Sequence, residues 1–199
     1  MKTQKINTMK SVTRIAFFAI LVVFASCKSK ESSAQKKESG PAAKSEVKAP
    51  QVDIHTAVIT DNLAALKQHI SAGSNINEKD PYGGSSPLIS AAVFGKKEAA
   101  KILIDAGADI NVTNNDGSTA LHSSAFFCRL EIVKMLLDKG ANKTVKNKYG
   151  STAYESVTGP YSEVKNVYEM MQQMLSPMGL KLDYAYIEKT RPVIAAMLK

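Results

Sequence analysis

The feature that most constrains this chain is a stretch of sequence that returns after a fixed interval. Residues 85–111 align with residues 118–144, position by position, at a spacing of 33. The same interval separates three turn glycines, Gly84, Gly117 and Gly150. A period of this length is typical of stacked repeat proteins, in which one unit cannot bury its apolar face and neighbouring units complete the core. Such proteins work through an exposed surface more often than through a closed active site.

Apolar residues at helical spacing predict helices within each unit. They are Ala99, Ile102, Leu103 and Ala106 in one unit, and Ile132, Val133, Leu136 and Leu137 in the next. Gly107 and Gly140 follow these runs, where a left-handed residue commonly ends a helix. Ser86 and Thr119 precede earlier segments as N-caps. The interval from Gly73 to Gly107 is 34, which predicts one extra residue in the first turn, at 80–84.

The units resemble ankyrin repeats. The family signature T-P-L-H-x-A-A corresponds to SPLISAA at 86–92 and TALHSSA at 119–125, and its second half is nearly intact at 130–142. The resemblance implies an all-α solenoid of antiparallel helix pairs joined by projecting hairpin loops. We expect about three to four repeats with a helical C-terminal cap.

The first 51 residues predict export and membrane anchoring. A basic segment leads into ten apolar residues at 15–24, a length that suits a signal peptide and is too short to span a bilayer, which takes about 20. The following Phe24-Ala-Ser-Cys27 resembles a bacterial lipobox, in which the cysteine is lipidated, although Phe24 replaces the usual leucine. A plain secretory signal with an incidental cysteine is the alternative. We expect a membrane-anchored lipoprotein of the bacterial cell envelope that faces the periplasm.

The expected organisation of the chain follows from these patterns. Residues 28–51 contain one large aliphatic residue, Val47, so they are predicted to form a disordered tether. A longer helix is expected at about 162–175, and one or two short helices at 182–199, with Pro192 as a break or a helix start. The expected segments are a signal peptide (1–26), lipidated Cys27 and tether (27–51), repeats over 52–180 (52–84, 85–117, 118–150 and a degenerate 151–180) and a cap (181–199).

The net charge of +8 resides mainly outside the repeats. Residues 1–26 carry four basic side chains and no acid, and residues 28–51 carry six lysines and three glutamates. The remaining body, 52–199, has 16 basic and 15 acidic side chains. A nucleic-acid interface needs a basic patch on the folded domain. The near-neutral body argues against that class of partner.

Aromatic residues at the end of the first helix of each pair are the first candidate binding site. Phe94 and Phe127 lie one period apart, accompanied by Val93 and Phe126. In ankyrin-like units these positions look toward the concave groove where partners commonly dock. An exposed aromatic pair would serve as an anchor. The alternative is that one residue of each pair packs into the core.

The hairpin tips are the second candidate. The residues expected to project there are Tyr82, Asn114, Asn115, Lys146, Lys148 and Tyr149. Lysines 139, 143, 146 and 148 form a basic cluster, and aspartates 105, 109 and 116 supply acid one unit earlier. This pattern could select an acidic patch on a partner. The alternative is a solvated polar face.

The cysteine, histidine and methionine residues of the repeats and the cap are expected to have structural roles. Cys128 and His122 could be drawn as a nucleophile and a base, but the resemblance implies a structural His122 and places Cys128 where the family has glycine. The three histidines lie in different units without metal-ligand spacing, and no cofactor motif is present. The methionines near 170–178 are expected to fill the core of the cap rather than form an adaptable binding face.

These observations favour a non-enzymatic protein-protein interaction module. It is expected to be a monomer that binds a protein partner through its concave face and hairpin tips, with no cofactor, no small-molecule substrate and no nucleic acid. The alternative is an inhibitor or immunity-type protein that neutralises a specific enzyme or toxin. A third hypothesis, a small hydrolase using Cys128 and His122, is the least favoured.

Overall fold

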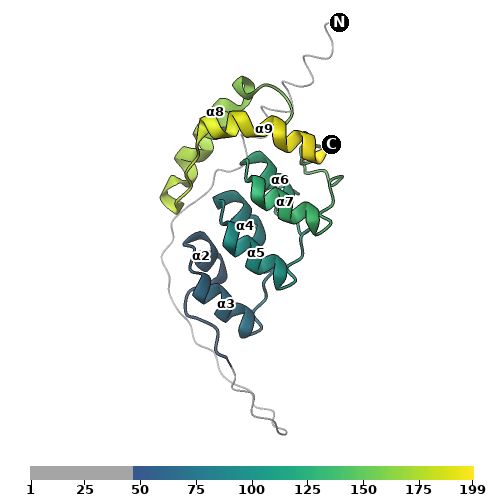
Figure 1. Cartoon of the computed structure of the whole chain (residues 1–199). Helices are drawn as coiled ribbons and strands as arrows, with labels where there is room; N and C mark the ends of the chain where they lie inside the picture. Colours follow the sequence, from purple (N-terminus) through teal and green to yellow (C-terminus); the bar gives the residue numbers. More distant parts are fainter. Residues whose placement is uncertain (1–46) are drawn as a thin grey trace, which may run out of the picture.

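A computed structural model describes residues 47–199 of the chain (Figure 1). The predicted signal peptide, the lipidation at Cys27 and nearly all of the tether lie outside the described residues. Within residues 47–199, no helix has both the length and the apolar composition needed to cross a membrane.

Three helix pairs stack side by side (Figure 1). The pairs are α2 (Ile54–Ile59) with α3 (Leu63–Ser71), α4 (Pro87–Phe94) with α5 (Lys97–Asp105), and α6 (Ala120–Phe126) with α7 (Leu130–Asp138). The first helices of the pairs contact one another along the stack, and so do the second helices. The predicted all-α repeat solenoid is confirmed, with three repeats followed by C-terminal helices.

The first helix of each pair begins at a side-chain cap. Asp53, Ser86 and Thr119 each accept a hydrogen bond from the backbone N–H three residues later, which satisfies a donor that the first turn leaves free. The N-caps predicted at Ser86 and Thr119 are therefore confirmed.

A left-handed residue joins the two helices of each pair. Asp61, Gly95 and Cys128 occupy this position, with φ of 60°, 67° and 53°. Glycine adopts this backbone without a steric penalty, whereas a side chain costs about 1–2 kcal/mol there. Cys128 therefore does occupy the position where the second repeat has glycine, and it carries local strain.

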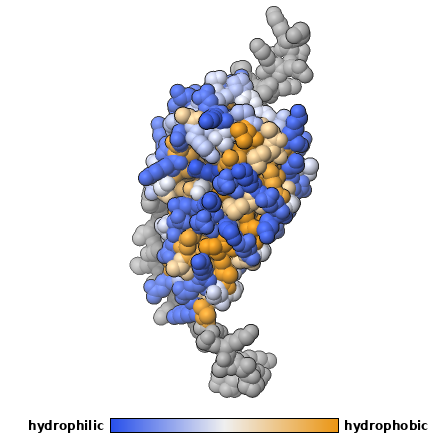
Figure 2. Space-filling model, in the orientation of Figure 1, coloured by the Kyte–Doolittle hydropathy of each residue, from blue (hydrophilic) through white to orange (hydrophobic). Residues whose placement is uncertain are grey.

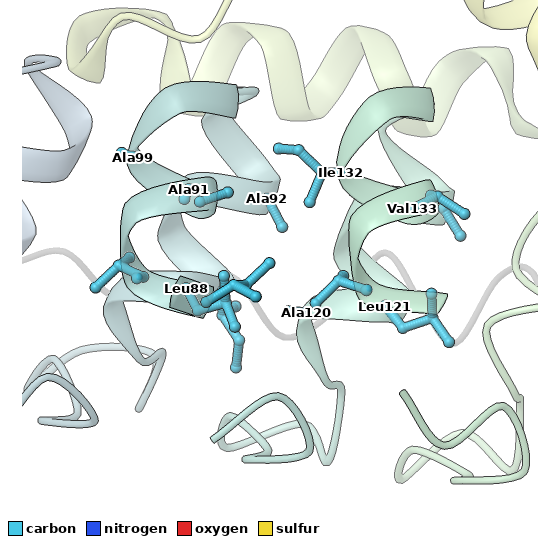
Figure 3. Packing of buried hydrophobic residues seen from close by; sticks show 14 of the residues in the cluster. Leu88, Ala91, Ala92, Ala99, Ala120, Leu121, Ile132 and Val133 are labelled. Atoms are coloured by element: carbon cyan, nitrogen blue, oxygen red, sulfur yellow. The ribbon is translucent and has the colours of Figure 1, made fainter. Parts of the chain in front are cut away.

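The core is built from small residues at the helix contacts and larger aliphatic residues between them. In Figure 3, Ala92, Ala120 and Ile132 lie in the space between the second and third helix pairs. The alanines permit close approach of the helices, and buried leucines such as Leu88 and Leu121 fill the remaining volume. Each buried large aliphatic side chain contributes about 1.5–3 kcal/mol.

The segment predicted as a degenerate fourth repeat forms no helix pair. Residues 151–157 make only turns, because the chain reaches Gly159 and Pro160 before a helical segment can form. The next helix, α8 (Tyr161–Leu175), agrees with the predicted helix to within one residue. A short 3-10 turn, η1 (Ser176–Met178), follows it.

The last helix, α9 (Tyr184–Leu198), contacts α6, α7 and α8 and lies across the end of the stack (Figure 1). It is a single helix with Pro192 in its interior, so the prediction that Pro192 breaks or begins a helix is wrong. Ile187 and Ile194 are buried on either side of this proline, and their packing holds the helix together where the proline cannot donate a hydrogen bond.

The methionines of α8 do not fill the core. Met170, Met171 and Met174 are half-buried, and Met178 is exposed. The buried residues of this helix are Val164, Val167 and Tyr168. The prediction of a methionine-filled cap is therefore wrong, because branched and aromatic residues occupy the buried face instead.

Candidate partner-binding surface

Each repeat presents a hairpin loop of the same construction. A backbone N–H closes each loop by donating to a carbonyl across it: Asp80 to Ser85, Asn114 to Ser118, and Asn147 to Ser151. The side chains of Asp80, Asn114 and Asn147 also accept backbone N–H groups from within their own loops, as Asx turns do. The first loop is one residue longer than the others, which confirms the predicted insertion.

Successive loops are joined to one another through the backbone. The N–H of Asn115 donates to the carbonyl of Gly83 at 2.9 Å, and the N–H of Lys148 donates to the carbonyl of Asp116 at 2.8 Å. Asn115 also packs tightly over Gly84, where an added Cβ would lie 2.3 Å from its Oδ1. The three loops therefore form one continuous row with a defined spacing.

The predicted tip residues differ in their exposure. Tyr82 is 75% exposed, the largest exposed fraction among the exposed large hydrophobic residues of 47–199. Asn115, Lys146 and Lys148 are also exposed, whereas Tyr149 is half-buried. Burial, together with the nearby charge of Asp116, raises the pKa of Tyr149.

Charge along the row of loops is predominantly basic at its C-terminal end. Lysines 139, 143, 146 and 148 are all exposed. Of the acidic residues predicted one unit earlier, Asp105 forms an ion pair with Lys101 on its own helix, with 2.5 Å between Nζ and Oδ2. Its charge is therefore partly compensated locally. Figure 2 shows that hydrophilic and hydrophobic areas alternate over the face drawn in Figure 1.

The aromatic residues at the ends of the first helices are buried or half-buried. Phe127 is 6% exposed, and its ring meets Phe126 edge-on at 5.0 Å. Phe126 in turn stacks on Tyr168 of α8 at 4.7 Å. In the third repeat the alternative therefore holds: Phe127 packs into the core and is not an exposed anchor. Val93 and Phe94 are half-buried.

Two residues that sequence reasoning missed organise this covered end. The hydroxyl of Tyr168 donates to the carbonyl of Phe126 at 2.6 Å, and Nη1 of Arg191 donates to the same hydroxyl at 2.8 Å. Tyr168 could have been found from its position four residues after Val164 on an apolar helix face. No sequence signal marks Arg191 as buried.

His122 and Cys128 do not form a catalytic pair. Nδ1 of His122 bonds to Thr119 and Nε2 to the carbonyl of Ser151 at 3.1 Å, so the predicted structural role is confirmed. The buried thiol of Cys128 donates to the carbonyl of Ile187 at 3.7 Å, and burial raises its pKa to about 11. A nucleophilic cysteine needs a thiolate and a base within hydrogen-bond reach, and this arrangement supplies neither. Residues 47–199 contain no cluster of three or more metal-binding side chains.

Comparison with known proteins identifies the repeats. A family model described as ankyrin repeats, in three copies, matches residues 54–147. Protein phosphatase 1 regulatory subunit 12A of Mus musculus is 41% identical over 64 residues, covering 32% of this chain and 6% of that protein. Protein phosphatase 1 regulatory subunit 27 of Homo sapiens is 38% identical over 64 residues, covering 32% and 41%. The human DNA-binding protein RFXANK is 34% identical over 61 residues, covering 31% and 24%.

A solved structure gives the same result. The ankyrin repeat domain of Bcl-3, a member of the IkappaB protein family, superposes with a TM-score of 0.51 and 28% sequence identity over 58% of this chain and 50% of that chain. The chain spans less than half the length of the curated relatives named above. Residues 54–147 thus form an all-helical domain of three ankyrin repeats, a protein-binding module that the C-terminal helices extend.

Proposed function

We propose that this chain binds a protein partner through its row of hairpin loops, and does so while held at a bacterial envelope membrane by a lipid on Cys27. The observation that carries the proposal is the exposed ring of Tyr82 on a loop whose neighbours are fixed by backbone hydrogen bonds. A rigid surface pays little conformational entropy on binding, and an exposed aromatic residue is a common anchor.

The partner surface that best fits this row carries an apolar pocket and acidic side chains. Tyr82 lies at one end of the row, and Lys146 and Lys148 lie at the other. Opposite charges on the partner would accelerate association and set its orientation, with a rate that falls as salt is raised. The half-buried Phe94 ends α4, at the opposite end of that helix from the loop that precedes Ser86, so it lies apart from these tip residues. The rings of Phe126 and Phe127 pack against each other, and Phe126 also stacks on Tyr168.

The anchoring part of the proposal rests on sequence alone. The basic and apolar segment before Cys27 and the polar residues 28–51 support it. Metabolic labelling with a fatty-acid probe tests this point. Loss of label in Cys27→Ala supports the anchor, and persistence of label in that variant excludes it.

Site-specific crosslinking tests the binding surface. A photoreactive phenylalanine analogue replaces Tyr82 in cells, and a matched control replaces Lys67, which is exposed on α3. The proposal predicts one dominant crosslinked protein from position 82 and none from position 67. Tyr82→Ala with Lys148→Glu should reduce co-purification of that protein while leaving the unfolding midpoint unchanged. Equal crosslinking from both positions would contradict the proposal.

A second candidate, regulation of an enzyme, has a specific observation in its favour. Two of the relatives are by name regulatory subunits of protein phosphatase 1. The crosslinked partner distinguishes the two candidates. An enzyme whose turnover changes on addition of stoichiometric repeat protein supports regulation or inhibition. A partner without catalytic activity supports a purely structural attachment.

A further inference from the structure

A cavity of about 450 Å³, open to solvent on one side, lies between α9 and the turn that precedes α8. Its walls come from both segments: Val157, Thr158, Gly159, Tyr161, Glu188, Arg191, Pro192 and Ala195. Figure 1 shows α8 and α9 side by side at the end of the stack. The cavity is separate from the hairpin loops, so an inference about it stands apart from the proposed partner surface.

Arg191 in the wall of this cavity is a buried cation without an acidic partner. The residue is 2% exposed, and no ion pair among residues 47–199 includes it. Its Nη1 donates to the hydroxyl of Tyr168 at 2.8 Å, and weaker contacts reach the carbonyls of Ser156 and Thr158 at 3.4 and 3.5 Å. Its Nε is buried and has no hydrogen-bond partner in the structure of residues 47–199. A buried charge is costly unless an opposite charge compensates it.

Tyr161 supplies a second donor on the same cavity. Its hydroxyl is buried and likewise lacks a hydrogen-bond partner within the described part of the chain. Native proteins satisfy most buried polar groups, so two unsatisfied donors lining one cavity call for an explanation. The remaining wall is largely apolar, with Val157, Pro192 and Ala195.

We infer that this cavity binds a carboxylate joined to a short apolar group. The carboxylate would accept hydrogen bonds from the guanidinium of Arg191 and the hydroxyl of Tyr161, and it would neutralise the buried charge. The apolar group would pack against Val157 and Pro192. Such a ligand is either a free small acid or the C-terminal carboxylate of a peptide, since both present the same chemistry.

Glu188, at the rim of the cavity, allows the proposed position of the ligand carboxylate to be checked. Its side chain lies on the exposed side of α9 and carries a negative charge next to the place where the ligand carboxylate would bind. Like charges repel, so Glu188 should weaken binding of the carboxylate, and its neutral isostere should strengthen it. If Glu188 were instead the natural counter-ion of Arg191, its removal would destabilise the protein and leave ligand binding unimproved.

The test is an NMR titration of the full chain carrying Cys27→Ala. The probes are 3-methylbutyrate and N-acetyl-glycyl-leucine, each compared with its amide. We expect dissociation constants of about 1 mM for at least one acid, with shifts centred on α9 and the 157–161 turn, and no saturation by either amide. Preference for the first probe indicates a small-acid ligand, and preference for the second indicates a peptide C-terminus. Absence of binding by both acids, or equal binding by the amides, would overturn the inference.

Three variants complete the test. Tyr161→Phe removes a hydroxyl that has no partner, so it should weaken acid binding by about 3- to 10-fold without lowering stability. Glu188→Gln should strengthen binding without lowering the unfolding midpoint. Glu163→Gln, which alters an exposed residue of α8 outside the cavity, should change neither. Unchanged binding in Tyr161→Phe, or a destabilised Glu188→Gln protein with unimproved binding, would refute the assignment of these side chains.

Discussion

The left-handed glycine between α4 and α5 provides a quantitative test of how the repeats are held together. Gly95 has φ of 67°, and a Cβ added there would lie 2.9 Å from Nε and 3.0 Å from Cζ of Arg129. Arg129 is itself fixed, because its Nη2 donates to the carbonyl of Val93 at 3.1 Å. Gly95→Ala must therefore strain the backbone and also displace a side chain that bridges the second and third repeats.

The magnitude follows from these two effects. A non-glycine residue in the left-handed region costs about 1–2 kcal/mol. Loss of the Arg129 hydrogen bond adds about 1–2 kcal/mol, since the displaced guanidinium is partly buried. We expect Gly95→Ala to lower the free energy of unfolding by about 2–4 kcal/mol. Gly107→Ala is the matched control. Its φ is 86° and no atom lies within 4 Å of an added Cβ, so it should cost only the strain.

Urea unfolding followed by circular dichroism measures both changes. A double-mutant cycle isolates the contact, because in an Arg129→Ala background Gly95→Ala should cost no more than Gly107→Ala. Equal costs for Gly95→Ala and Gly107→Ala in the wild-type background would refute the reasoning. So would an undiminished cost of Gly95→Ala after Arg129 has been removed.

Three further predictions concern buried polar groups. Burial lowers the pKa of His122 below 6.5, so the unfolded chain takes up a proton first and the free energy of unfolding should fall as the pH drops below 6.5. The difference between the urea midpoints at pH 7.5 and pH 5.5 should therefore be smaller in His122→Ile than in the wild type, and an unchanged difference would contradict this. Burial raises the pKa of Cys128 to about 11, so little thiolate is present at pH 8 in the folded protein. In a Cys27→Ala chain, Cys128 should react with a thiol reagent at least about 100-fold more slowly when folded than in urea, and rapid labelling of the folded protein would count against its burial. Tyr168→Phe removes a partner of Arg191 and should cost about 2–4 kcal/mol by thermal unfolding, whereas a cost under 1 kcal/mol would show that the bond is dispensable.

Much of the fold was predictable because it depends on short-range patterns. The helix pairs follow from apolar spacing, and their starts follow from capping residues such as Ser86 and Thr119. The position of the first loop's extra residue followed from the interval between Gly73 and Gly107. Each of these signals acts within one repeat or between adjacent repeats, so the sequence contains it directly.

The candidate site was predicted less well. The exposure of Tyr82 and the tip lysines agrees with the prediction, because projecting turns stay in solvent wherever the rest of the chain packs. Phe127 was a candidate anchor, but its buried ring packs against Phe126, which in turn stacks on Tyr168 about 40 residues further along the chain. Pro192 was misread for a related reason, since local propensity opposes a helix there and packing against the repeats supports one.

By itself, the amino-acid sequence determined that this protein is a stack of about three to four helical units with a period of 33 residues. Periodicity alone dictates that arrangement, because each unit must bury its apolar face on the next. Only the tertiary structure decided how the stack ends. The packing of α8 and α9 across the third repeat stacks Tyr168 on Phe126 and leaves Arg191 buried beside a cavity. These outcomes depend on contacts between segments with no common period, and such contacts leave no regular signal in the sequence.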